Sequence, residues 1–433
     1  MSCRFVHRTS MASLYFLVCF FGSLASTNAQ TETPPTADQA PTSPTSQASL
    51  QKPRRASLLK FDATPASLIT TPTAVEGNQQ DAGASGQFAS RRDGTDKVSK
   101  ASEFVVAPFP ISNPLLGSGL VLVGGYLFPL SSRDTVSPTS MIGGGSFYTS
   151  NGSWLWAMGS KLYLKQDRFR FTGVYGKAQL HYDLYGVGNA AGNLGLSIPI
   201  NQGGKALFME TLIRLWGKFF VGPRYQWRDL DAQVKGRVLP IGINIDPIEL
   251  KSTTSAMGFH IQNDLRDNQF YPTRGTLADV VGDFFQGSFG SDFSYQTYTF
   301  AFNKYSGLTP RQVLAFRIFG CASTGRVPFY DLCLLGMHND IRGYKAGQYR
   351  DKLMLTTQAE YRLELPKRFG LVGFFGVGEV APELGAFNNE NLKPAGGGGI
   401  RFTVAKKNHV NLRVDYAAGL QGGGIYMGVT EAF

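Results

Sequence analysis

The chain has 433 residues and a formal net charge of +11, and 42% of its residues are hydrophobic. Its mean hydropathy of −0.11 excludes a membrane protein built from several helices, because each spanning helix needs about 20 mostly apolar residues. A membrane β-barrel is still allowed, since its strands alternate apolar and polar residues. The positive charge comes without a basic helix or zinc-ligand spacing. It therefore favours anionic lipid or lipopolysaccharide as a partner over nucleic acid.

Residues 1–29 have the layout of an export signal. Arg4 and Arg8 precede the apolar run Ala12–Ala25, and the small residues STNA end at Ala29. A positive start, an apolar stretch too short to span a bilayer and small residues before a cleavage site are typical of a signal peptide. We predict an exported protein, with an uncleaved anchor as the alternative.

Residues 30–103 change composition to Pro, Thr, Ser, Gln and Ala, as in TETPPTADQAPTSPTSQ. No period of 3.6 or 2 residues runs through the segment. Such a sequence buries too little apolar surface to offset the entropy of ordering, so we predict a disordered arm. Its basic clusters, Lys52–Arg55 and Arg91–Arg92, are interpreted as solvated linker or as a contact with a membrane surface or partner.

From residue 104 to residue 433, apolar and polar residues alternate with period two in segments of about 9 to 14 residues. Segments 205–216 and 409–417 alternate in this way. Segment 352–365 also does so: its polar face carries Gln358, Glu360, Arg362 and Glu364. Strands of this length cross a bilayer at a tilt, whereas strands in soluble proteins average about 5 or 6 residues.

Turn sequences separate these strands at Asn151–Gly152, Gln166–Asp167, Ser291–Asp292 and Lys406–Asn408. Fifteen strands are clear, and a sixteenth is expected in Glu103–Ile111. Bacterial barrels have an even number of strands, and closure leaves no unpaired edge in lipid. The prediction is an all-β protein: a 16-stranded antiparallel transmembrane β-barrel over residues 104–433, after a disordered N-terminal arm.

Enzyme motifs occur only as fragments. Gly186–Ala191 (GVGNAA) has the letters of a dinucleotide loop but opens no expected helix, so a phosphate would find no helix N-terminus there. There is no Walker loop and no HExxH motif. His409 and Asp415 share a strand face without a serine. We predict no enzyme activity, no cofactor and no metal site.

Two stretches are more specific. Residues 263–275 read NDLRDNQFYPTRG, and their turn-forming residues are Asp264, Arg266, Asp267, Asn268, Pro272 and Gly275. Short polar side chains bond the local backbone and Pro and Gly fix φ, so this pattern predicts a rigid turn. The second stretch is a loop of about thirty residues that contains NDIRGYKAG, and such length usually indicates a function.

With these motifs the chain resembles the BamA/TamA superfamily of outer-membrane assembly and translocation barrels, also described as the bacterial surface antigen domain. The resemblance covers roughly residues 104–433 and is carried by the DLRDN turn, LLGMHNDIRGY, QAEYRLEL and the C-terminal Phe433. Phe433 matches the C-terminal signal of such barrels, although Glu431 stands where an apolar residue is usual. The resemblance implies a sixteen-stranded barrel whose long loop folds into the lumen, where an arginine meets acidic residues of the wall.

Carried over, the loop motif is Ile341, Arg342, Gly343 and Tyr344, and the wall acid is Glu360. The alternation independently places Glu360 on the polar face. A second acid is expected in the next strand, but Gly376 stands there with Glu379 nearby. The family usually carries POTRA domains, where this chain has the low-complexity arm. The resemblance therefore implies a member without them, for which a separate periplasmic partner is an alternative recruiter of clients.

The resemblance implies a place in the outer membrane of a Gram-negative-type bacterium. There the protein would assemble, insert or translocate client membrane proteins or lipid. The alternatives are a passive outer-membrane pore and a surface-exposed receptor or adhesin. A large salt-dependent conductance would favour the pore, and crosslinks of clients to the barrel seam would favour assembly.

Two local features leave alternatives open. Export permits a disulfide between Cys321 and Cys333, but the sequence does not decide between the bridged and the free thiols. The final strand opens on the glycine-rich run 419–424. Because glycine packs no side chain, we predict that the seam between the first and last strands is the weakest point of the wall. Alternatively, these glycines only form the turn before Ile425.

Overall fold

The computed structural model describes residues 102–113, 117–131, 133–134, 136–234, 247–337, 340–405 and 409–433. The expected signal peptide, the expected arm up to residue 101 and the expected turn at 406–408 lie outside the described residues. The described residues form a barrel of antiparallel strands, whose first strand begins at Glu103.

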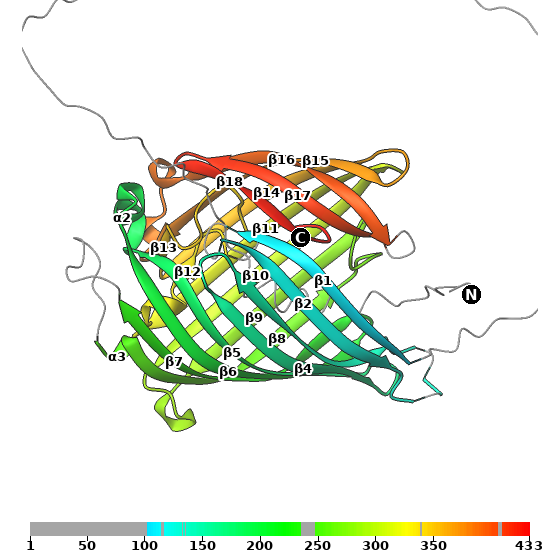
Figure 1. Ribbon diagram of the computed structural model, residues 1–433, viewed down its shortest axis with the longest axis horizontal. Coiled ribbons are helices and arrows are strands. Elements are labelled where there is room, and N and C mark those ends of the chain that lie inside the picture. Colours follow the sequence, from blue (N-terminus) through cyan, green and yellow to red (C-terminus); the bar gives the residue numbers. More distant parts are fainter. Residues whose placement is uncertain are drawn as a thin grey trace, which may run out of the picture. The chain divides into compact units, whose positions relative to one another are not determined.

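Sixteen strands close the barrel (Figure 1). They are β1 Glu103–Asn113, β2 Gly117–Phe128, β3 Ser140–Thr149, β4 Trp154–Leu164, β5 Phe169–Tyr185, β6 Ser197–Trp216, β7 Phe219–Val234, β8 Lys251–Asp264, β9 Gly275–Phe285, β10 Tyr295–Thr309, β11 Gln312–Gly325, β14 Leu353–Glu364, β15 Phe369–Ala381, β16 Lys393–Ala405, β17 Val410–Gly419 and β18 Gly422–Val429. The prediction of a sixteen-stranded antiparallel barrel, with its first strand over Glu103–Ile111, is confirmed.

The remaining elements lie in the connections. A two-stranded ladder pairs β12 (Cys333–Leu334) with β13 (Arg350–Asp351). Two short helices are α2 (Gly188–Leu194) and α3 (Pro247–Leu250). Single 3-10 turns occur at η1 Gly287–Phe289, η2 Phe329–Asp331, η3 Leu384–Ala386 and η4 Asn389–Asn391. Within the part of the chain that the structure describes, no helix has the length and apolar character needed to cross a membrane.

Helix α2 corrects one prediction. The segment Gly186–Ala191 was expected to open no helix, yet α2 begins within it at Gly188. The helix ends at Gly195, whose φ of 66° lets its N–H bond the carbonyl oxygen of Gly192. Contacts with a distant loop, described below, hold these seven residues in place, and a period-based reading cannot detect such contacts.

The alternation of side chains produces two different wall surfaces. In β14 the side chains of Leu355 and Tyr361 are exposed on the outside, while those of Gln358, Glu360 and Arg362 are buried on the inside. Successive side chains of a strand point to opposite faces, so one strand supplies both an apolar lipid-facing surface and a polar interior.

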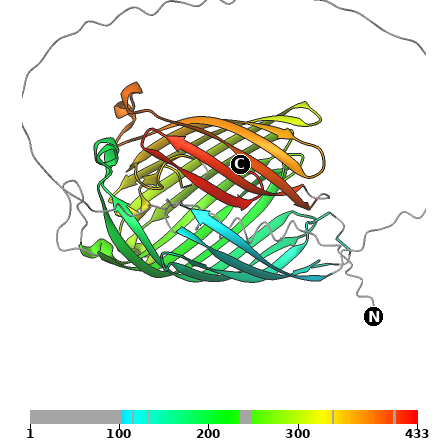
Figure 2. The ribbon, with the colours of Figure 1, turned by 45° about the horizontal axis from the view of Figure 1, so that its top comes forward.

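Antiparallel connection gives the barrel two distinct ends. The connections β5–β6, β7–β8, β11–β14 and β17–β18 share one end, which we call the loop end. Helices α2 and α3 and the β12–β13 pair gather there, at the left of Figure 1, and the green α2 keeps that place after the turn in Figure 2. The β8–β9 turn and the residues after β18 share the opposite end, the turn end.

The wall closes where β18 meets β1, which we call the seam. Among the described residues the register of this pair contains only Ser112↔Met427. On its other edge, β18 pairs with β17 continuously from Leu412↔Val429 to Gly419↔Gly422. The cyan β1 and the red β18 border the seam in Figure 2.

Two expectations for the last strand are corrected. Its glycines do not simply form a turn, because Gly419 ends β17, the turn is Leu420–Gln421 and β18 begins at Gly422. The strand also does not reach Phe433: it ends at Val429, where Thr430 takes a positive φ of 69°. The N–H of Thr430 still donates to the carbonyl oxygen of Asn411 in β17 at 2.6 Å, and residues 431–433 lie outside the strand.

Candidate functional site in the lumen

Residues 326–352, the long loop, run from β11 back to β14. The structure joins Cys321 of β11 to Cys333 of β12 by a disulfide. The bridge fastens the first part of the loop to the wall strand that it has just left.

A second fastening lies on another part of the wall. Arg228 of β7 donates to Asp331 of the loop, with 2.7 Å between Nη1 and Oδ1 and a second contact from Nη2. The hydroxyl of Tyr295 in β10 donates to the same carboxylate. Beside it, Phe329 is buried in an apolar cluster with Leu184, Ile198, Ile200 and Ala232. Both charge pairing and apolar burial therefore hold the loop against β5–β7 and β10.

Arg342 is the third fastening and lies on the opposite part of the wall. Its Nη2 is 2.5 Å from Oε2 of Glu360 in β14, and its Nη1 is 2.7 Å from Oδ2 of Asp415 in β17. The guanidinium also lies over the ring of Phe374 in β15, 3.4 Å from its centroid. The side chains of Arg342, Glu360 and Asp415 are at most 1% exposed. Planar guanidinium groups suit such two-sided pairing with carboxylates.

These residues belong to a larger set of buried charges, the luminal network. Its members are Arg342, Glu360, Arg362, Arg401, Asp415 and Glu431. Glu360 also accepts from Arg362 at 2.8 Å, and Asp415 also accepts from Arg401 at 2.5 Å. Arg401 in turn donates to Glu431 at 2.7 Å. Glu360 and Glu431 each face two arginines, and Asp415 faces a third, Arg413 of its own strand, at 3.8 Å. Removing Arg342 leaves each of its two acids with fewer partners inside the barrel, and breaking buried pairs of this kind costs about 3–5 kcal/mol.

The two residues after Arg342 contact the hairpin formed by β17 and β18, which we call the terminal hairpin. The N–H of Gly343 donates to the hydroxyl of Tyr426 in β18 at 2.6 Å. The hydroxyl of Tyr344 accepts from the N–H of Leu420 at 3.3 Å. A Cβ on Gly419 would lie 2.5 Å from the ring of Tyr344. Only glycine therefore leaves room for this tyrosine against β17.

The second wall acid is not where the resemblance placed it. Gly376 lies opposite Gln358 in the β14–β15 ladder and offers no acid. Glu379 accepts from the N–H of Asn388 at 3.0 Å, in the connection after β15. Asp415 of β17 supplies the second carboxylate instead. Sequence reasoning had put Asp415 on the polar face of its strand, but nothing local indicated that Arg342 reaches it.

The turn motif lies at the turn end, between β8 and β9. Arg266 donates to both oxygens of Asp264 at 2.9 Å. The carboxylate of Asp267 accepts the N–H groups of Asn268, Thr273 and Arg274. Asn268 accepts from Phe270 and Tyr271. A Cβ on Gly275, which has a φ of 102°, would lie 2.2 Å from the carbonyl oxygen of Leu265. The motif is thus a turn built from side chain to backbone bonds.

The hydrogen bonds of this turn affect the acidity of Asp267. Partial burial acts to raise its pKa, but the bonds from the Thr273 hydroxyl and the three backbone N–H groups outweigh burial. The pKa of Asp267 is therefore lowered from its ordinary value.

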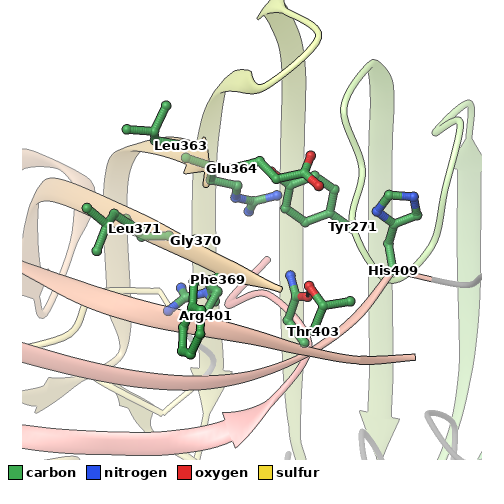
Figure 3. A pocket seen from close by; sticks show the side chains of 12 residues that line it. Tyr271, Leu363, Glu364, Phe369, Gly370, Leu371, Arg401, Thr403 and His409 are labelled. Carbon is green, nitrogen blue, oxygen red and sulfur yellow. Dashed lines mark hydrogen bonds between the residues drawn. The ribbon is translucent and has the colours of Figure 1, made fainter. Parts of the chain in front are cut away.

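The turn also contacts the luminal network. The carbonyl oxygen of Pro272 accepts from Arg362 at 3.4 Å, and the ring of Tyr271 stacks on His409 with centroids 5.9 Å apart. Figure 3 shows the small pocket between them, into which Tyr271, Arg401 and His409 project. Arg362 also donates to the carbonyl oxygen of Phe433 at 2.8 Å. The last residue of the chain therefore lies beside the network.

The family model of the Omp85 superfamily domain matches residues 144–422. This chain belongs to the Omp85 superfamily. The match includes the strands from β4 to β17, the β8–β9 turn and the whole long loop.

Two solved Omp85-like structures are similar to this chain in fold. BamA from Haemophilus ducreyi lacking POTRA domains 1-3 has a TM-score of 0.52 and 14% identity, with 76% of this chain and 69% of that chain covered. CdiB from Escherichia coli has a TM-score of 0.50 and 12% identity, with 76% and 62% covered. The chain therefore spans less than two thirds of the length of that CdiB. No curated protein matches the chain.

Membership makes this chain an outer-membrane β-barrel of the Omp85 superfamily, whose members are generally transport and assembly proteins and not enzymes. Across the described ranges, no group of three or more His, Cys, Asp or Glu side chains could hold a metal ion. The site's chemistry is electrostatic: it fixes the long loop to strands that are far apart in the sequence.

Sequence reasoning missed three parts of this Omp85 site. Asp331 and Arg228 lie 103 positions apart, and no motif links them. Arg401 was not singled out, because it follows the glycine run 396–399, where the alternation of apolar and polar residues is not visible. Glu431 was noted only as a departure from an apolar pattern, and its bond to Arg401 explains that departure. One signal was available: an acid at a usually apolar position near the C-terminus, such as Glu431, needs a basic partner if it is buried.

Proposed function

We propose that this Omp85 barrel inserts or translocates client membrane proteins at the outer membrane by opening its wall at the seam. The observation that carries the proposal is the register of β18, which among the described residues pairs with β1 at Ser112↔Met427 alone. A strand edge with free N–H and C=O groups is a template for another strand. A client strand could therefore add to β1 or β18 by backbone pairing.

The luminal contacts support the same proposal. Arg342 and Tyr344 bind the terminal hairpin from inside the barrel, so β18 keeps its place without a full ladder to β1. Side-chain contacts of this kind can be exchanged one by one, whereas a continuous ladder separates only with the loss of many backbone bonds in lipid. An opening wall is thus less costly here than at any fully paired strand.

A passive pore receives less support. The long loop crosses the lumen between Asp331, bound to β7, and Arg342, bound to β14 and β17. A loop fastened on both walls obstructs the path that a pore would need. Lipid and lipopolysaccharide remain the expected surroundings of the outer surface, and a separate periplasmic partner remains an expected recruiter of clients.

A disulfide across the seam tests the proposal. Ser112→Cys with Met427→Cys joins register partners, and partners in antiparallel strands have Cα atoms about 4.5–5.5 Å apart, within the range that a disulfide spans. The matched control is Leu120→Cys with Tyr148→Cys, which joins outward-facing partners in the continuous β2–β3 ladder.

The readout is insertion of an unfolded outer-membrane barrel protein, supplied in urea, into vesicles that contain each variant. We expect the oxidised seam lock to abolish insertion, the control lock to retain it, and mild reduction to restore it. Full insertion by the locked seam would exclude lateral opening. If that protein also conducted ions strongly, the passive pore would be the better description.

A further inference from the structure

One buried amide at the loop end joins three parts of the barrel. Gln348 of the long loop is 5% exposed. Its Nε2 donates to the carbonyl oxygen of Gly192 in α2 at 3.0 Å and to the side-chain oxygen of Gln421. Gln421 lies in the turn of the terminal hairpin. A single NH2 group therefore donates one hydrogen bond to α2 and one to the turn of the terminal hairpin, which belong to different parts of the wall.

Helix α2 reaches this point from β5 and β6, far from the seam in strand order. The side-chain amide of Gln421 donates to the carbonyl oxygen of Asn193 at 3.0 Å, which completes the connection from the hairpin turn to α2. Asn189 of α2 donates to the carbonyl oxygen of Val380 at the end of β15, at 2.8 Å. The helix thus binds across the loop end to strands near the seam.

Packing supports these bonds. A Cβ on Gly192 would lie 2.4 Å from the ring of Tyr349, so the helix approaches the loop as closely as glycine permits. The hydroxyl of Tyr349 also donates to the side chain of Asn193 at 3.1 Å. The sequence Gly186–Ala191, which resembles a dinucleotide loop only in its letters, begins a helix that is fitted to this loop.

We propose that Gln348 is a positioning residue for the terminal hairpin, and that with Gly192 and Gln421 it forms a latch that sets how often β18 leaves the seam. The proposal rests on the proposed function, because it concerns the strand that is to open. It differs from the luminal contacts of Arg342, which act on the inner face of the hairpin, since the latch acts on the hairpin turn at the loop end. A client or ligand that displaced α2 would release the turn without disturbing the buried charges.

Hydrogen exchange measured by mass spectrometry tests the latch in the full chain, reconstituted in lipid nanodiscs. Gln348→Leu keeps a side chain of similar size and removes both donors. Gln421→Ala removes the exposed partner, so it perturbs folding least. We expect each to speed exchange in β18 by about 5- to 30-fold, the ratio that the loss of one or two such bonds produces.

Two comparisons make the result specific. Gln286→Leu removes an exposed glutamine of the same end, in the β9–β10 connection, and should leave β18 exchange unchanged. Exchange in β9 and β10, which pair continuously, should stay as in the wild type in every variant. General loosening would instead speed exchange in all strands.

The latch and the proposed function fail in different ways. Wild-type exchange in β18 for both Gln348→Leu and Gln421→Ala would overturn the latch, even if the seam disulfide still blocked insertion. Faster exchange confined to β18, together with full insertion by the seam-locked protein, would support the latch and overturn lateral opening.

Discussion

The two edges of β18 are paired to very different extents in the described barrel. Toward β17 the ladder is continuous over the whole strand, and toward β1 the register contains only Ser112↔Met427. Backbone bonds hold the strand along its β17 edge, and the long loop adds contacts to the same hairpin from inside the barrel and at the loop end.

Under the proposed function, this difference lets a closed wall open at the seam. The long loop binds β14, β17 and β18 from inside the barrel through Arg342, Gly343 and Tyr344. These contacts help to hold the hairpin where the β1–β18 ladder is short. A ladder resists separation at all positions together. Contacts made by one loop depend on where that loop lies, so the wall can respond to the loop.

Loss of the buried arginine should produce the largest effect on this arrangement. Arg342→Ala leaves Glu360 and Asp415 facing one arginine fewer, and we expect unfolding to be easier by about 3–5 kcal/mol. Arg342→Lys should recover only part, because an ammonium group cannot bond both acids in the same planar manner. Urea unfolding and the shift between unheated and boiled samples on a mild detergent gel measure both. Wild-type behaviour of both variants would mean that the hairpin does not depend on the loop.

Reduction of the Cys321–Cys333 disulfide should have the next largest effect, and it acts on the long loop far from the seam. Cys333 is tied to β11, whose two neighbours are fully paired, so reduction should loosen the loop but not the wall. We expect reduction to lower the free energy of unfolding by about 3 kcal/mol, because the bridge restricts the entropy of the unfolded chain over a closed loop of this size. Mass spectrometry of protein from its native envelope should find Cys321 and Cys333 bridged. Two free thiols would refute the attachment of the long loop to β11 by a disulfide.

A methyl group added at the hairpin should cost less. Gly419→Ala places a Cβ about 2.5 Å from the ring of Tyr344. Overpacking of this kind costs about 1–3 kcal/mol and should push the tyrosine off the hairpin. Gly373→Ala is the matched control, because a Cβ at Gly373 has no neighbour within 4 Å. Equal stability of the two variants would show that Tyr344 does not hold β17.

The sequence predicted those parts of the fold and of the luminal site that depend on residues close together in the chain. Alternation over single strands predicted the sixteen-stranded wall and the inward face of Glu360, because side-chain direction follows from the strand itself. The β8–β9 turn was also readable, since Asp267, Asn268 and Gly275 bond or crowd atoms within a few positions.

Features that depend on distant parts of the chain could not be predicted. Many polar residues point inward, and only the path of the long loop decides that Asp415 meets Arg342 while Glu379 does not. Helix α2 has seven residues and no capping side chain, so its stability comes from Tyr349 and Gln348, which lie over 150 positions away. The last strand ends at Val429, and two residues later Glu431 bonds Arg401, 30 positions away in the luminal network.

The smallest predicted effect concerns the turn end, away from both edges of β18. The lowered pKa of Asp267 means that its hydrogen bonds stabilise the turn at pH values above the ordinary pKa of aspartate, about 3.9, and that this contribution is lost as the pH falls through the lower folded value. Exchange of the amides of Asn268, Thr273 and Arg274, which donate to Asp267, should therefore increase below about pH 4, after correction for intrinsic rates. Asp267→Asn should remove this pH dependence, and an unchanged acid response would contradict the assignment.

Native-state hydrogen exchange of the wild-type barrel in lipid tests the role of the seam most directly. The amides of β1 and β18 that lack a partner across the seam should exchange much faster than those of β9 and β10, whose ladder is continuous. Exchange in β17 should be intermediate, because its partner β18 can leave with the seam. Uniform protection of all sixteen strands would contradict an opening seam.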